Sequence, residues 1–170
     1  MRTIIIEKTS ITDLATDAIV NAANENLWPG AGVCGAIFRA AGYERLVEAC
    51  NSIGHCDTGS AVITPGFGLE AKYIIHAVGP IWFGGDRGEP EKLYGAYRKS
   101  LELALENGCR SIGFPLISTG VYGYPKEKAW RVAIGACRDF QRTNDMEIVF
   151  AVMDDRSLEA GQRVLQEIEA

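Results

Sequence analysis

The chain has 170 residues, of which 47% are apolar, and its formal net charge is −5 at pH 7. This length suffices to bury one sizeable hydrophobic core and does not require two, so we expect a single domain over residues 1–170. The acidic balance provides no general attraction to a nucleic-acid backbone or to an anionic membrane surface. We therefore expect neither a nucleic acid nor a membrane among its partners.

Six short runs rich in β-branched residues predict strands, and four stretches with helical periodicity predict helices. The predicted strands span residues 3–6, 18–20, 61–64, 73–78, 111–114 and 147–152. The predicted helices span residues 33–49, 93–105, 125–140 and about 157–168, with Pro125 in the first turn of the third. This alternation predicts a layered α/β domain with a largely parallel sheet, and the close spacing of the third and fourth strands adds some mixed pairing.

The five cysteines are scattered and odd in number, and no long apolar run precedes them. Reduced thiols and a cytoplasmic location are the simplest interpretation. Cys50, His55 and Cys56 could be imagined around zinc, but they lack the paired CxxC or HxxxH spacing of zinc sites. We expect no metal and no resident cofactor.

Two glycine-rich loops, residues 23–35 and 118–124, each lie between a predicted strand and an amphipathic stretch. Glycine lets the main chain approach a ligand, and the helix that follows presents its positive dipole end to an anion. Ligands of parallel α/β sheets bind beyond the carboxyl ends of the strands, where both loops begin. The two loops therefore predict one crevice that holds a diphosphate from both sides with main-chain amides.

The first loop also satisfies the GxGxxG pattern of dinucleotide-binding enzymes, through Gly30, Gly32 and Gly35. In those enzymes the pattern follows its strand directly, and an acidic residue at the end of the next strand holds a ribose. Here residues 21–28 intervene, and the next predicted strand ends at Thr64 and Pro65. A Rossmann-like NAD enzyme is therefore an alternative that lacks its ribose partner.

Four separated motifs cover nearly the whole chain. They are VNAAN at 20–24, GAGVCGAIFRAAG at 30–42, HAVGP at 76–80 and STGVYGYP at 118–125. In this order they resemble the macro domain family, in particular its MacroD-like branch. The resemblance implies a three-layer α/β/α sandwich with a mixed, largely parallel central sheet, and it implies ADP-ribose or an ADP-ribosylated protein as the partner.

The resemblance also implies roles for individual residues. Asn24 would contact the distal ribose and Tyr122 would pack beside it, while the backbone of both loops would grip the diphosphate. Near the adenine, Ser10 stands where the family usually has Asp, and Met153 stands where it often has an aromatic residue. The implied ligand-binding residues are Ser10, Ile11, Asn24, Gly30, Ala31, Gly32, Val33, Cys34, Ser118, Thr119, Gly120, Val121, Tyr122 and Met153.

Two departures from the family pattern bear on catalysis. In MacroD-like hydrolases the position of Cys34 is usually Asp and that of Phe38 is usually His, so the carboxylate often assigned to activating water is missing. The first hypothesis is still a hydrolase of mono-ADP-ribosyl protein or O-acetyl-ADP-ribose, in which the catalytic Asn24 and the substrate phosphates position the water. The second is a module that binds ADP-ribose without turnover, which the two departures favour.

Several residues in these motifs also have simpler structural interpretations. We expect Cys34 to be a small apolar residue rather than a nucleophile, and Phe38 to belong to the core. His76 is expected to be buried and hydrogen-bonded rather than a general base, and Asn21 to tie the first loop to the sheet. The segment 84–89 is rich in glycine and charge, and we predict a solvated loop there.

Overall fold

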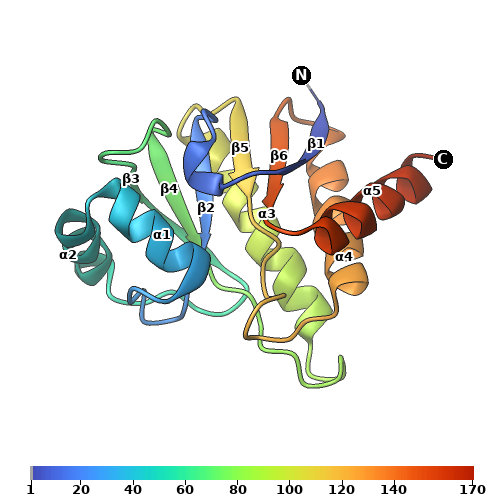
Figure 1. Cartoon of the computed structure of the whole chain (residues 1–170), viewed down its shortest axis with the longest axis horizontal. Coiled ribbons are helices and arrows are strands. Elements are labelled where there is room, and N and C mark those ends of the chain that lie inside the picture. Colours follow the sequence, from blue (N-terminus) through green and yellow to red (C-terminus); the bar gives the residue numbers. More distant parts are fainter. Residues whose placement is uncertain (1) are drawn as a thin grey trace.

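The computed structural model describes residues 2–170, which form one six-stranded mixed sheet with helices around it (Figure 1). Along the sheet the strands follow the order β1-β6-β5-β2-β4-β3, and each neighbouring pair is parallel except β3 with β4. The predicted mixed, largely parallel sheet is thereby confirmed. The strands are β1 (Ile4–Lys8), β2 (Ala18–Ala22), β3 (Ala61–Pro65), β4 (Tyr73–Ala77), β5 (Ser111–Phe114) and β6 (Glu147–Val152).

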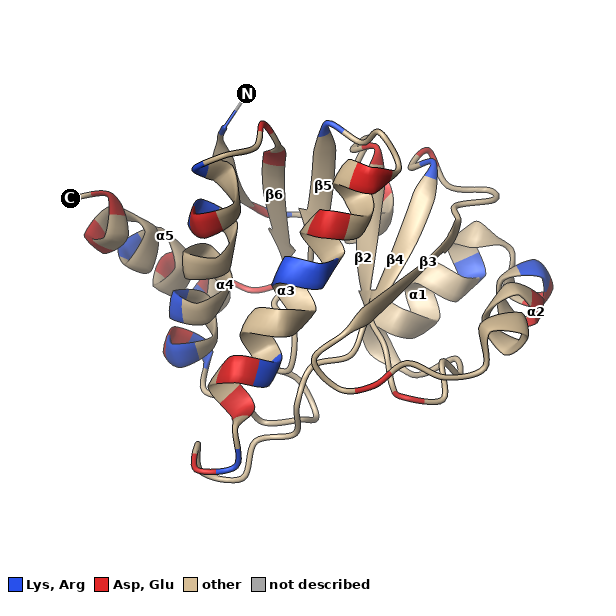
Figure 2. Cartoon of the chain, turned by 180° about the vertical axis from the view of Figure 1, so that it is seen from behind, with Lys and Arg blue, Asp and Glu red and all other residues tan. Residues whose placement is uncertain are grey.

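Helices cover both faces of the sheet, as a three-layer sandwich requires. The front of Figure 1 shows α1 and α2 over β2, β4 and β3, whereas the reverse view in Figure 2 shows α3 and α4 over the other face. The last helix, α5, packs against α4 and β1. The helices are η1 (Ile11–Asp13, a 3-10 turn), α1 (Gly32–Ala41), α2 (Tyr43–Ile53), α3 (Glu89–Glu106), α4 (Lys126–Gln141) and α5 (Asp155–Glu169).

Successive residues of the central strands point into two separate hydrophobic cores, because side chains alternate across a sheet. On β2, Ile19 packs with the core under α1 and α2, while Val20 packs with the core under α3 and α4. On β4, Ile74 and Ile75 divide in the same way. Strands buried on both faces read as the continuous apolar runs from which they were predicted.

The predicted helix over residues 33–49 is wrong, because Gly42 divides it into α1 and α2. The φ of Gly42 is 113°, a value that residues with a Cβ rarely adopt. Its N–H donates to Phe38 O at 3.2 Å and closes α1, and its carbonyl accepts from Leu46 N at 3.0 Å and opens α2. The apolar periodicity continues through both helices, so it could not reveal the break.

The loops that follow β2, β4 and β5 lie together at the carboxyl end of the sheet, at the bottom of Figure 1. A backbone bond of 2.9 Å from Ala23 N to Ala77 O holds the first two loops side by side. None of the helices within residues 2–170 is long and apolar enough to cross a membrane.

The predicted solvated loop at 84–89 is wrong at its last residue, because Glu89 is buried and begins α3. Its carboxylate accepts three backbone N–H groups, from Phe83 at 2.8 Å, Gly85 at 3.0 Å and Arg87 at 2.6 Å. Burial alone would raise the pKa of Glu89, but these hydrogen bonds outweigh it and lower the pKa to about 2. The loop thus encloses the buried carboxylate of Glu89.

Replacing Glu89 by Gln should lower the melting temperature at neutral pH, because an amide NH2 group would face backbone donors. A depressed carboxyl pKa contributes stability above the unfolded-state pKa of 4.5, and that stability is lost as the pH falls toward about 2. The difference between wild type and Glu89→Gln should therefore shrink over this interval when unfolding is followed by circular dichroism. Glu91→Gln, an exposed position in the same helical turn, is the control, and a difference independent of pH would contradict the assignment.

Candidate functional site

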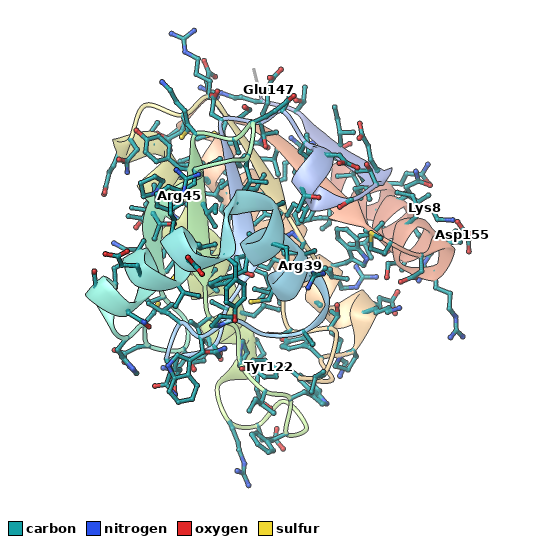
Figure 3. The ribbon with its side chains drawn as sticks, turned by 60° about the vertical axis from the view of Figure 1, so that its left-hand side comes forward. Lys8, Arg39, Arg45, Tyr122, Glu147 and Asp155 are labelled. Carbon is teal, nitrogen blue, oxygen red and sulfur yellow. The ribbon has the colours of Figure 1, made fainter. Side chains whose placement is uncertain are left out.

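A cavity of about 460 Å³ opens at the carboxyl end of the sheet. The segments that follow β2, β5 and β6 form its walls, and Gly79, just beyond β4, completes them. Figure 3 places Tyr122 on the loop at the foot of the sheet, with α1 above it. The cavity brings together twelve of the fourteen ligand-binding residues predicted from the sequence: Asn24, Gly30, Ala31, Gly32, Val33, Cys34, Ser118, Thr119, Gly120, Val121, Tyr122 and Met153.

One wall of the cavity is the uncapped N-terminus of α1. The N-cap residue, Ala31, has no side-chain oxygen, and the first turn contains no acidic residue. Gly32 has a φ of 58°, and no atom lies within 4 Å of the place where its Cβ would be. The first N–H groups of this helix are therefore free to bind an anion, which the helix dipole also favours.

The second wall is the compact turn from Ser118 to Tyr124. Ser118 O accepts from Tyr124 N at 2.9 Å, and Gly120 O accepts from Gly123 N at 3.0 Å. In the part of the chain that the structure describes, the N–H groups of residues 119–122 have no acceptor. Successive free N–H groups in a tight turn form a concave anion site, so both walls offer main-chain donors.

Close backbone approach between the β4 and β5 loops shapes this second wall. A Cβ on Gly79 would overlap Ser118 Oγ and lie 2.5 Å from Ile117 Cγ2. Ser118 itself has a φ of 71°, and its buried hydroxyl has no partner within residues 2–170. A strained residue with an unpaired hydroxyl beside a cavity is typical of a binding site.

Asn24 closes a turn and lines the cavity. Its Nδ2 donates to Trp28 O at 2.9 Å, and its Oδ1 accepts from Trp28 N at 3.0 Å. Each of these two atoms retains one further bonding position. The carboxamide is thus held in one orientation while it can still bind a ligand or a water.

Cys34, Phe38 and His76 have the structural character expected of them. Burial raises the pKa of the Cys34 thiol, so it is protonated at neutral pH. Phe38 is 1% exposed, and its ring centroid lies 6.4 Å from that of His76. His76 is buried and hydrogen-bonded to Thr64, and burial lowers its pKa to about 4. None of the three offers a charged group for catalysis at neutral pH.

Two predicted contacts, Ser10 and Ile11, do not line the cavity. Ser10 Oγ pairs with Thr12 Oγ1 at 2.8 Å, and Ile11 is buried in the core with Ala151. The carboxamide of Asn21, on β2, lies 3.1 Å from His76 on β4, so it links two strands of the sheet rather than the first loop to the sheet.

The cavity also contains residues that were not predicted, and Asp154 is the only charged one among the described lining residues. It is the N-cap of α5, where it accepts from Ser157 N at 2.7 Å. This hydrogen bond lowers the pKa of Asp154. The signal that could have found it is Asp154 followed three residues later by Ser157 just before an apolar helical pattern. The other lining residues that were not predicted are Ala22, Ala23, Gly79, Pro115, Leu116, Ile117, Ala151, Val152 and Ser157.

The chain is an α/β sandwich with a cavity at the carboxyl end of its sheet. The cavity offers main-chain donors, and none of its described lining residues is Lys or Arg. These features define a class of protein that binds phosphate-containing ligands. The sequence profile of the Macro domain family matches residues 20–133. A protein of Citrobacter rodentium named O-acetyl-ADP-ribose deacetylase is 50% identical over 161 residues, which cover 91% of this chain and 90% of the relative. The chain therefore belongs to the macro domain family.

Solved structures agree with this assignment. The Oceanobacillus iheyensis macrodomain with ADP is 39% identical, with a TM-score of 0.92 over 96% of this chain and 90% of that one. The Trypanosoma brucei macrodomain in complex with ADP-ribose is 43% identical, with a TM-score of 0.87 over 95% of this chain and 68% of that one.

Replacing Gly79 by Ala should destabilise the protein by about 1 to 3 kcal/mol, because the new methyl group displaces the segment at Ile117 and Ser118. Gly135→Ala is the control, since nothing lies within 4 Å of its Cβ position in α4 and Ala favours a helix by about 0.5 to 1 kcal/mol. Chemical denaturation measures both changes. Equal stability of the Gly79→Ala variant and wild type would show that Gly79 is not closely packed against Ile117 and Ser118.

Proposed function

We propose that the protein binds ADP-ribose and hydrolyses ADP-ribose derivatives, either mono-ADP-ribosyl protein or O-acetyl-ADP-ribose, as one macro domain over residues 1–170. The observation that carries the proposal is the pair of facing donor groups, the N-terminus of α1 and residues 119–122, across one cavity. A diphosphate between them would receive hydrogen bonds on both sides. The names of the relatives point to the same ligand.

The proposed ligand lies across the cavity with its diphosphate on the amides. At one end of the ligand, Asn24 and Tyr122 would contact the distal ribose, because both residues line the cavity. Met153, which is 63% exposed and lines the cavity from the end of β6, would cover the adenine. Ser10 and Ile11 do not line the cavity in this structure. We propose that they support the adenine-binding wall, or contact the adenine itself, only when a ligand is bound.

In the proposed reaction, water adds across the ester bond and releases ADP-ribose and the free carboxylic acid. Cys34 is a neutral thiol, and Asp154 is held by Ser157 and pairs with Lys126 at 3.5 Å. Asn24 with the substrate phosphates would therefore position the water, and the loop amides would stabilise the developing charge. Positioning and electrostatics account for the whole catalytic effect in this scheme.

A second candidate function is ADP-ribose binding without turnover. The observation that favours it is the neutral Cys34 thiol at the position where a carboxylate would activate water. Binding and hydrolysis share the same cavity, so the two candidates differ only in the release of product.

Replacing Gly32 by Glu should weaken ADP-ribose binding at least tenfold, about 1.4 kcal/mol, because a carboxylate would occupy the place of the diphosphate. Gly108→Glu is a matched control: it too has a positive φ, 77° against 58°, and open space at its Cβ, but it lies in the turn after α3. Calorimetry with ADP-ribose and with AMP gives the comparison. Equal affinities for the two ligands, or full affinity in Gly32→Glu, would remove the basis of the proposal.

Hydrolysis is tested by the order of rates among three variants. Asn24→Ala should lose turnover by about a hundredfold or more, because it removes the group that holds water. Cys34→Ala should slow turnover far less, and Cys34→Asp should raise it by placing a carboxylate at the cavity wall. Asn51→Ala, at an exposed position on α2, is the control. The measurement is the release of ADP-ribose from each of the two substrates. If wild type binds ADP-ribose but releases none from either substrate, hydrolysis is excluded and binding without turnover is the function.

A further inference from the structure

The segment of residues 79–88, between β4 and α3, is bonded to the turn that forms the second wall of the cavity. Within this segment only Gly79 lines the cavity itself. Trp82 N donates to Tyr122 O at 2.9 Å, and the Trp82 ring packs against the ring of Tyr124, with centroids 4.6 Å apart. Tyr124 is buried and closes the turn through its bond to Ser118 O. Trp82 therefore holds the turn from outside the cavity at two places.

One peptide group connects this contact to the donor groups of the turn. The carbonyl of Tyr122 accepts from Trp82, and the N–H of the same peptide group, which belongs to Gly123, donates to Gly120 O at 3.0 Å. This peptide group cannot rotate without breaking both bonds. The two glycines would otherwise allow the turn many conformations. The bond from Trp82 therefore helps to keep the free N–H groups of residues 119–122 in place at the cavity wall.

The segment that carries Trp82 is itself ordered by Glu89. Three of its glycines have a φ between 77° and 96°, and a segment so rich in glycine loses much conformational entropy when it is fixed. The buried carboxylate of Glu89 accepts three N–H groups of this segment, including those of Phe83 and Gly85. Phe83 directly follows Trp82, and a Cβ on Gly85 would lie 2.9 Å from Trp82 Cη2. The main chain that Glu89 holds thus lies against the indole ring.

We propose that Glu89 is a positioning residue for ligand binding, whose carboxylate acts through Trp82 to keep the donor groups of residues 119–122 directed toward the diphosphate. Glu89 itself does not line the cavity. A buried anion costs free energy that an apolar residue would not, which is consistent with a role beyond packing. Without the carboxylate, the segment is free to leave the turn, and only molecules whose turn stays in place bind the diphosphate from both sides. The role in binding rests on the proposed function, whereas the connection from Glu89 to the turn does not.

The role in binding is tested by calorimetry with ADP-ribose at a temperature where circular dichroism shows each variant to be folded. Glu89→Gln should weaken binding by about fivefold to tenfold, because an amide NH2 group facing the donors of the segment leaves fewer molecules with a competent turn. Gln141→Glu is the matched control. It makes the reverse exchange at a residue 3% exposed, whose amide donates to Thr3 O and Met146 O at the other end of the sheet, and its affinity should equal that of wild type. Unchanged affinity in Glu89→Gln, or an equal loss in Gln141→Glu, would overturn this role.

The path through Trp82 is tested by a double-mutant cycle. Trp82→Ala removes the ring that packs against Tyr124 and should weaken ADP-ribose binding to a similar degree, whereas Trp82→Phe keeps an aromatic ring there and should bind nearly as tightly as wild type. If Glu89 acts through Trp82, the double variant of Glu89→Gln and Trp82→Ala binds no more weakly than the weaker of the two single variants. Losses that add in full would overturn the path.

Amide hydrogen exchange in ligand-free protein tests the connection without ADP-ribose. Glu89→Gln should speed the exchange of the Trp82 N–H at least tenfold relative to that of Ile134, a buried residue in the middle of α4 whose exchange reports global stability. If Glu89→Gln does not fold, Glu89→Asp, which keeps the charge on a shorter side chain, takes its place. Equal acceleration at Trp82 and Ile134 would overturn the connection. If wild type does not bind ADP-ribose, the proposed function fails, while the exchange at Trp82 still decides whether Glu89 holds the segment against the turn.

Discussion

The parallel pairing of β2 with both β4 and β5 is the constraint on which the cavity depends. Ala18 is in register with Tyr73 on one side and with Ile112 on the other, so the three strands run in the same direction. Their following loops must then leave from the same edge of the sheet. The apolar residues that bury both faces of β2 thus also determine where the two glycine-rich loops meet, and close contacts between the β4 and β5 loops then shape one wall of the cavity.

Main-chain amides recognise an anion differently from lysine or arginine side chains. A flexible cation attracts any phosphate, whereas an N–H group has a direction that the fold determines. At this cavity the donors are held by conformations that cost energy, including the φ of 71° at Ser118, of order 1 to 3 kcal/mol. The core supplies the stability that holds them. An acidic chain can therefore bind an anionic ligand without a large basic patch that would attract nucleic acids.

Much of the fold could be predicted from the sequence because apolar periodicity reports which residues face a core. The six strands were predicted within about two residues, since each is a short β-branched run with at least one buried face. The break between α1 and α2 could not be predicted in this way, because Gly42 lies inside an unbroken apolar pattern. Nor could the burial of Glu89, since its partners are main-chain N–H groups, which every residue except proline carries.

The site could be predicted where the backbone of adjacent residues forms it, and not where distant segments meet. Residues 30–34 and 118–122 are continuous in sequence, and the cavity brings them together. Gly79, Asp154 and Ser157 reach the same cavity from β4 and β6, so only the sheet topology places them there. Ser10 and Ile11 were predicted from a family position alone, and no cavity wall includes them.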